Sequence, residues 1–170
     1  MASTVAMPVE EYLRSSWRPD REYIDGATVE RTGGDLIHAT LIIQVGELLK
    51  KRGLVAGGNP RIRVRSDRIR IPDVIAVREL REHWLVTEPP YSVVEIISRD
   101  DRALDIMERV KDFLDFGVPN IWFVDMWHRA VIVYTREGSR TLLDSVTTSD
   151  GAISIPVNEI FAGIPEIPMD

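Results

Sequence analysis

Residues 71–77 read IPDVIAV and residues 91–98 read YSVVEIIS, and each of these apolar runs carries one carboxylate. Side chains alternate between the two faces of a strand, so Asp73 and Glu95 each share a face with the aliphatic residues two positions away. Both runs are rich in Val and Ile, as buried strands are. We therefore predict two strands whose carboxylates point inward, toward the core or a cleft beside it.

These two carboxylates are candidates for a shared metal site. An ionised carboxylate inside a sheet is costly unless a positive charge compensates it, and one divalent cation compensates two carboxylates. Asp73 and Glu95 are separated by 22 residues, which allows a short helical excursion over residues 78–84 and a return strand beside the first. The structural alternative is that Asp73 caps a strand after Pro72 and that Glu95 pairs with a buried arginine.

The composition narrows the kind of metal. The chain has no cysteine and three histidines, at positions 38, 83 and 128. Disulfides, thiolate zinc sites and a cysteine nucleophile are therefore excluded. A metal held mainly by oxygen is a hard ion, so we predict Mg²⁺ or Mn²⁺.

Length and charge limit the class of protein. The 170 residues, of which 44% are hydrophobic and 28% charged, fit one compact domain. No run approaches the roughly 20 apolar residues of a membrane span, and the N-terminal segment lacks a signal-peptide pattern. We expect a cytoplasmic protein without a membrane partner. The net charge of -6 disfavours a general nucleic-acid binder.

Hydrophobic periodicity predicts an α/β (α+β) fold, in which helices flank a mixed sheet. We divide the chain into an N-terminal helix and extension (residues 1–20) and a single domain (residues 21–165). The predicted elements are a helix at 9–15, a hairpin at 22–30 around Asp25-Gly26, a helix at 36–52 capped by Gly53, a hairpin at 61–77, a strand at 91–97, a helix at 102–116 ended by Gly117, strands at 120–125, 130–134 and 140–144, and a last helical turn within 157–165.

The hairpin at 61–77 concentrates positive charge. Its period-2 alternation predicts one aliphatic face and one arginine face, a natural place for contacts with a nucleic-acid backbone. The alternatives are a solvated strand face or salt bridges between subunits. The arginines are Arg61, Arg63, Arg65, Arg68 and Arg70.

The order PD, about twenty residues, then Glu-x-x in a strand resembles the PD-(D/E)XK nuclease superfamily. Within it, the chain resembles the Uma-two family of restriction-endonuclease-like proteins from about Glu22 to Phe161. The resemblance rests on EYIDG, His38, IPDVIAV, VVEIIS, the helix at 105–117, GVPNIWFVD and NEIF.

The resemblance implies a restriction-endonuclease-like core with Asp73 and Glu95 as metal ligands and the carbonyl of Ile96 as a further ligand. It also implies Glu22 and His38 as auxiliary residues of the site. From the residues alone, His38 is equally a satisfied core histidine, and Glu22 lies in a polar stretch typical of a surface.

One position departs from the superfamily pattern. The lysine expected two residues after Glu95 is replaced by Ile97, and the resemblance moves this lysine to the following helix, where the chain has Arg109. Lys111 lies about 200° from Arg109 around a helix, so both cannot face one site. Arginine can stabilise charge on a phosphate but cannot act as a general base.

These features favour a Mg²⁺- or Mn²⁺-dependent DNA endonuclease that acts on double-stranded DNA as a homodimer, because cutting both strands requires two active sites. The first alternative is a nuclease fold without turnover that binds DNA or a protein. The second is a glycosidase that uses Asp73 and Glu95 as an acid/base pair and needs no metal.

Overall fold

The computed structural model of the protein describes residues 6–31, 34–81 and 84–168. Its centre is a six-stranded mixed sheet in which only β7 and β8 run parallel. A parallel connection needs a crossover, and helix α3 (Ala103–Phe116) supplies it. In spatial order the strands are β10 (Gly138–Leu142), β9 (Ala130–Thr135), β8 (Ile121–Asp125), β7 (Ser92–Ile96), β6 (Val74–Val77) and β3 (Val55–Gly58).

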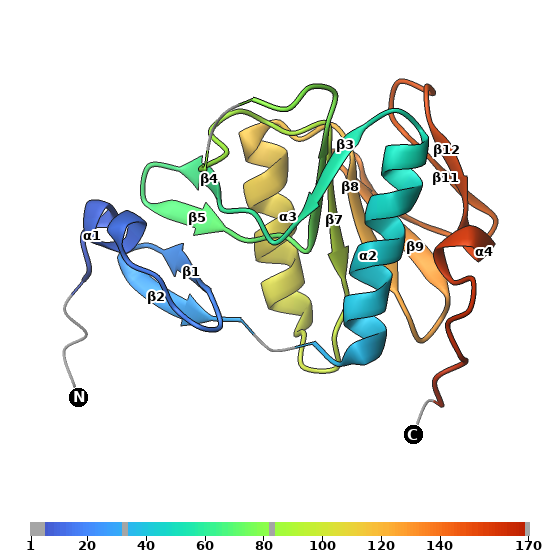
Figure 1. The fold of residues 1–170 in the computed structure, drawn as a ribbon, viewed down its shortest axis with the longest axis horizontal. Coiled ribbons are helices and arrows are strands. Elements are labelled where there is room, and N and C mark those ends of the chain that lie inside the picture. Colours follow the sequence, from blue (N-terminus) through green and yellow to red (C-terminus); the bar gives the residue numbers. More distant parts are fainter. Residues whose placement is uncertain (1–5, 32–33, 82–83, 169–170) are drawn as a thin grey trace.

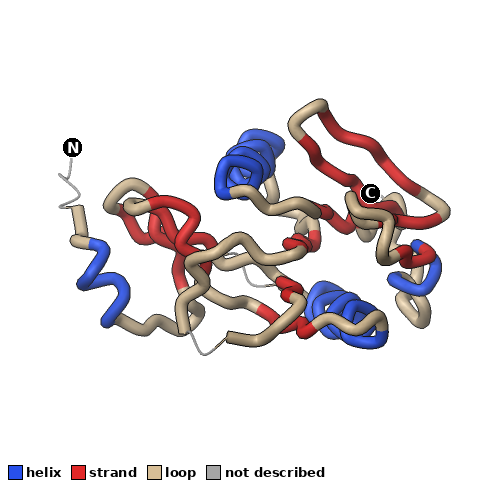
Figure 2. Tube along the Cα trace, turned by 90° about the horizontal axis from the view of Figure 1, so that it is seen from above, coloured by secondary structure: helices blue, strands red, loops and turns tan. Residues whose placement is uncertain are grey.

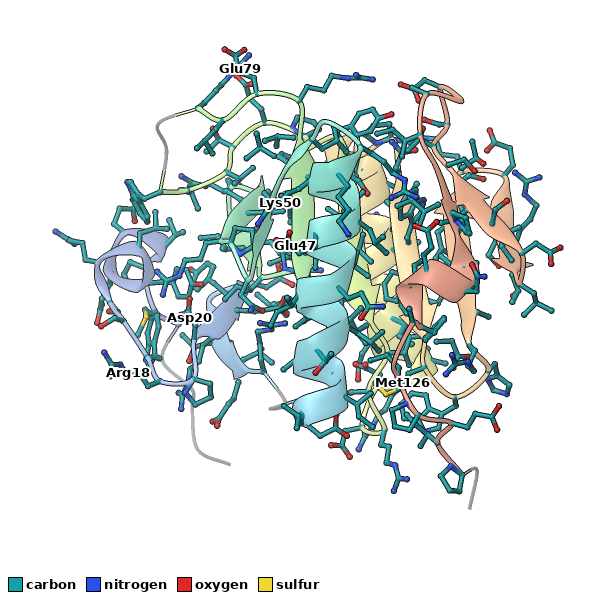
Figure 3. The ribbon with its side chains drawn as sticks, turned by 45° about the vertical axis from the view of Figure 1, so that its right-hand side comes forward. Arg18, Asp20, Glu47, Lys50, Glu79 and Met126 are labelled. Atoms are coloured by element: carbon teal, nitrogen blue, oxygen red, sulfur yellow. The ribbon has the colours of Figure 1, made fainter. Side chains whose placement is uncertain are left out.

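Two long helices cover opposite faces of this sheet (Figures 1 and 2). Alternation along β7 assigns the faces: Val94 packs in the cluster of α2 (Leu36–Lys51), whereas Val93 packs in the cluster of α3. Glu95 has the parity of Val93 along β7, so its carboxylate belongs to the α3 face. Asp73 immediately precedes β6, and its carboxylate contacts His38 at the start of α2. The outer surface of α2 carries an ion pair between Glu47 and Lys50 (Figure 3).

A smaller antiparallel sheet stands beside α3. Its strand order is β2 (Ala27–Glu30), β1 (Arg21–Ile24), β5 (Arg68–Arg70) and β4 (Ile62–Arg65). The β1–β2 turn has positive φ at Asp25 and Gly26 (50° and 91°), as a tight hairpin requires. Helix α1 (Val9–Arg14) packs on this sheet through the buried ring of Tyr12.

The C-terminal segment extends the core on the α2 side. It comprises β11 (Ser145–Thr147), β12 (Ser154–Pro156) and the short α4 (Val157–Ile160). Gln44 of α2 donates hydrogen bonds to three backbone carbonyls at the end of the segment, those of Glu159, Ile160 and Ala162. Across residues 6–31, 34–81 and 84–168, no helix combines the length and apolar character of a membrane span.

The α+β class and the mixed sheet with flanking helices are confirmed. The helical excursion over residues 78–84 is wrong for its described part, which has no helix; residues 82–83 lie outside the described residues. Strand β3 was not predicted, because its sequence, VAGG, has little strand propensity. It forms through pairing with β6.

The hairpin at 61–77 also differs from the prediction. Its second arm is divided between the two sheets, with β5 in the smaller and β6 in the larger. Pro72 lies at the break, since it lacks the N–H that would continue a ladder.

A β-bulge removes the predicted arginine face. The register shifts between Arg63 and Arg65, which places Arg63 opposite Ile69 rather than opposite Arg70. A one-residue shift moves every later side chain to the other face. Arg63 therefore lies on the α1 face of the smaller sheet, while Arg70 lies on the α3 face beside Ile62. The prediction of a single arginine face is wrong.

Candidate active site

Asp73 and Glu95 meet at the start of β6, beside β7. Asp73 immediately precedes β6, Glu95 lies in β7, and the two strands are antiparallel neighbours with Val74 opposite Val94. The backbone N–H of Asp73 donates to Glu95 Oε2 at 3.4 Å. Each residue is only 2% exposed. The predicted inward placement on neighbouring strands is confirmed.

The Asp73 carboxylate is held by three donors. Its Oδ2 accepts from the backbone N–H of Ile96 at 2.8 Å and lies 3.3 Å from His38 Nε2. Its Oδ1 accepts from Arg31 Nη2 at 2.6 Å. Burial opposes ionisation, but the hydrogen bond and charge of His38, followed by the charge of Arg31, hold the pKa of Asp73 below its usual range. Asp73 is therefore an ionised, fixed carboxylate.

Glu95 has the opposite electrostatic character. Its Oε1 is buried without a hydrogen-bond partner among the described residues. Burial raises the pKa of Glu95 to about 8, and the negative charge of Asp73 adds to the rise, while Arg109 and Arg31 oppose it. Asp73 is thus held in its ionised form, whereas nearby arginines compensate the negative charge of Glu95 only partly.

His38 lies at the start of α2, after Asp35 caps the helix by accepting from the His38 backbone N–H at 2.9 Å. Burial lowers the pKa of the imidazole, but hydrogen bonds to Asp73 and to the backbone carbonyl of Ile96 raise it above its ordinary value. The side chain is a neighbour of the carboxylate pair rather than a residue of the aliphatic core.

Arg109 reaches the pair from the first half of α3. Burial works against its charge, yet Glu95 above all, then Glu22 and Asp101, raises its pKa. Its Nη1 lies 3.5 Å from Asp101 Oδ1. Lys111 is on the outer side of the helix, paired with Asp115. Arg109 therefore lies near the carboxylates, on the flank where the sequence placed it.

Glu22 is buried, not on the surface, with 2% exposure. Its Oε2 lies 2.9 Å from Arg70 Nη1, and its Oε1 accepts from the backbone N–H of Ile71 at 3.0 Å. It raises the pKa of Glu95 through its charge. The Glu22 carboxylate is thus paired with the Arg70 guanidinium. The alternation of REYI along β1, with Glu22 two residues from Ile24, was a signal of this burial.

The five arginines of residues 61–70 are engaged within the chain. Arg70 and Arg68 are buried and pair with Asp112 and Glu108 of α3. Arg61 binds Asp20 at 2.6 Å and lies over the ring of Tyr12; Arg65 pairs with Asp25 and Asp67; Arg63 donates to the carbonyl of Ser66. The prediction that these arginines form an exposed surface is wrong for Arg68 and Arg70, because α3 covers both side chains.

Sequence reasoning missed Arg31 and Asn59. The guanidinium of Arg31 bridges Asp73 Oδ1 and Asn59 Oδ1, each at 2.6 Å. Asn59 stands in the left-handed region (φ 53°), and its backbone N–H donates to the carbonyl of Asp73. Neither residue belongs to a periodic pattern, so no local signal marks them.

The carboxylates of Asp73 and Glu95 fit a hard divalent cation. Glu95 Oε1, buried and without a partner in the part of the chain that the structure describes, would be one of its ligands. The oxygen atoms that could coordinate the metal are those of the Asp73 and Glu95 carboxylates and of the Ile96 carbonyl. Within the described residues, no three His, Asp, Glu or Cys side chains form a metal-binding group. The protein would therefore supply few ligands, as is usual for Mg²⁺, which keeps several waters.

The mixed sheet with flanking helices, and the meeting of Asp73 and Glu95 at the neighbouring strands β6 and β7, agree with the restriction-endonuclease-like fold predicted from the sequence. Residues 9–165 match the model of the Uma2 family, described as "Putative restriction endonuclease", and the chain belongs to this family.

The solved structures that are similar in fold include a protein from Anabaena variabilis described as a "putative nuclease belonging to DUF820". The two share 18% identity and a TM-score of 0.80, over 92% of this chain and 98% of the other. No curated protein matches the chain.

Proposed function

We propose that the protein is a metal-dependent endonuclease that hydrolyses phosphodiester bonds of double-stranded DNA. The observation that carries this proposal is the buried pair of Asp73 and Glu95, in which Glu95 Oε1 has no partner among the described residues. The family description supports a nuclease in general. The DNA substrate and the metal requirement are parts of the proposal.

Asp73, Glu95 and the Ile96 carbonyl would hold Mg²⁺ or Mn²⁺. When bound, such an ion polarises a phosphoryl oxygen and lowers the pKa of water. The Ile96 N–H and His38 keep the Asp73 carboxylate in one orientation.

Arg109 is placed to stabilise negative charge that develops on the phosphate, since its charge acts on Glu95 and its contact with Asp101 is a long one of 3.5 Å. Because arginine stays protonated, it does not remove the proton of the attacking water.

Plasmid cleavage tests the proposal. Supercoiled DNA incubated with the protein and Mg²⁺ or Mn²⁺ is expected to be nicked or linearised, and Asp73→Asn is expected to reduce the rate on the order of 100-fold or more. Asp115→Asn is the matched control, because Asp115 is exposed and forms its ion pairs with Lys111 and Arg136, away from the carboxylate pair. Absence of cleavage by the wild-type protein with either metal would overturn the proposal, as would undiminished cleavage by Asp73→Asn.

A binding or assembly module without turnover is the second candidate. Arg109 favours it, because this position lacks the titratable base that the resemblance implies for a lysine. Arg109→Lys separates the candidates: a gain of cleavage with unchanged DNA affinity in a gel shift would show that the site lacked only this base. DNA retardation without cleavage by either protein would favour the binding module.

We also propose a homodimer, since cutting both strands calls for two sites. Sedimentation equilibrium is the measurement. A monomer at all protein concentrations, with or without DNA, would contradict this part of the proposal.

A further inference from the structure

Asp73 already holds a cation from its own chain. We propose that Arg31 competes with the divalent metal for Asp73, so that release of this guanidinium sets the metal affinity of the site. This inference rests on the proposed function, because it concerns the same carboxylate. It makes Arg31 a positioning residue that acts through Asp73.

The contact is a strong one. Arg31 Nη2 lies 2.6 Å from Asp73 Oδ1, shorter than the usual 2.7–2.9 Å of a charge-assisted N–H···O bond. Its second nitrogen, Nη1, donates to Asn59 Oδ1 at the same distance. Two anchors on one planar guanidinium fix its orientation. Arg31 is therefore held against the carboxylate.

The hydrogen bonds of Asp73 make Oδ1 the oxygen for which the two cations compete. Oδ2 accepts from the Ile96 N–H and lies beside His38, so its two lone pairs face donors. Oδ1 has the remaining capacity, and Arg31 lies on it. A divalent ion at Oδ1 would stand beside a guanidinium in a buried site, where repulsion between cations is strong.

Arg31 is also the cation that can leave. Its side chain is 21% exposed, against 12% for His38, so the released guanidinium can regain water. Its charge acts on the second carboxylate as well, because it lowers the pKa of Glu95. Arg109, by contrast, has its ion pair with Asp101 rather than with Asp73. Release of Arg31 thus frees Asp73 without dismantling the rest of the site.

Mn²⁺ binding to the full chain without DNA tests the competition, by electron paramagnetic resonance of the free ion and by calorimetry. Arg31→Gln is expected to bind Mn²⁺ on the order of tenfold more tightly than wild type, the size of effect that residues next to metal ligands produce. Arg31→Lys keeps the charge and is expected to stay near wild type. Arg140→Gln is the control, because it removes one arginine from the exposed strand β10.

A second variant covers the case in which Arg31→Gln does not fold. Asn59→Gly removes the other anchor of the guanidinium and suits the positive φ at this position. It is expected to tighten Mn²⁺ binding by a smaller factor than Arg31→Gln.

The possible outcomes separate this inference from the proposed function. If Asp73→Asn abolishes Mn²⁺ binding but Arg31→Gln leaves the affinity unchanged or weaker, the metal site stands and the competition is overturned. If neither wild type nor Arg31→Gln binds Mn²⁺, both proposals fail. Tighter binding by Arg31→Gln that disappears in the double variant with Asp73→Asn supports the competition.

Discussion

Two groups of charged side chains, each largely buried, are built differently in this protein. The first, which we term the α3 ion-pair network, joins the smaller sheet to α3 through Glu22, Arg68, Arg70, Glu108 and Asp112. The second is the carboxylate pair of Asp73 and Glu95. In the network, each arginine contacts at least two carboxylates, whereas the pair places two carboxylates together.

The difference separates charges that hold the fold from charges suited to chemistry. Arg70, 3% exposed in its side chain, lies between Glu22 and Asp112, and burial is tolerable because opposite charges surround it. Glu95 is equally buried, but burial, together with the negative charge of Asp73, raises its pKa to about 8. Buried carboxyl groups with a strongly shifted pKa are concentrated at functional sites.

The largest effect is expected from breaking the network. Arg70→Met leaves Glu22 and Asp112 buried without their shared cation, which typically lowers the free energy of unfolding by about 3–5 kcal/mol. Urea denaturation followed by circular dichroism measures the loss. Arg140→Met on the exposed strand β10 is the control, with little expected change. A loss below about 1 kcal/mol for Arg70→Met would mean that the network is dispensable.

At the carboxylate pair, a substitution is expected to raise the free energy of unfolding near pH 8 rather than to lower it. Glu95→Gln removes the raised-pKa carboxyl while keeping its shape. A carboxyl with a raised folded pKa contributes stability that is fully present below its unfolded value near 4.5 and is lost as the pH rises to about 8. In the presence of EDTA, the stability of Glu95→Gln relative to wild type should therefore rise from pH 5 to pH 8, by roughly 3–4 kcal/mol.

Urea titrations at several pH values measure this difference for Glu95→Gln. The control is Glu47→Gln, whose carboxylate is on the surface of α2 and should show no comparable trend. A pH-independent difference between Glu95→Gln and wild type would contradict a raised pKa for Glu95.

The smallest effect is expected at an exposed ion pair. Lys50 and Glu47 are 2.9 Å apart on α2, with side chains 50% and 55% exposed (Figure 3). Such pairs contribute about 0–1 kcal/mol, and the side chains remain hydrated when one partner is lost. A double-mutant cycle with Glu47→Ala and Lys50→Ala should give a coupling below about 0.5 kcal/mol. A coupling as large as the loss expected for Arg70→Met would mean that the exposed ion pair and the α3 ion-pair network contribute equally to stability.

The helices and most strands were predictable because their signals are local. The apolar stripe of α3 and the stop at Gly117, whose φ of 97° favours glycine, lie within one short segment. Strand β3 lacks such a signal, since Gly57 and Gly58 carry no side chain and the strand depends on β6 for pairing. The bulge between Arg63 and Arg65 likewise has no local sequence signal and is visible only in the pairing of β4 with β5.

The sequence by itself determined the inward direction of Asp73 and Glu95 and the choice of Arg109 over Lys111, because alternation and helical spacing follow from backbone geometry. Only the tertiary structure decided which charges meet. It brought Arg31 to Asp73 across 42 residues and turned Arg68 and Arg70 onto α3. The physical reason is that ion pairing depends on distance and burial in space, which the chain acquires only when its separate elements pack together.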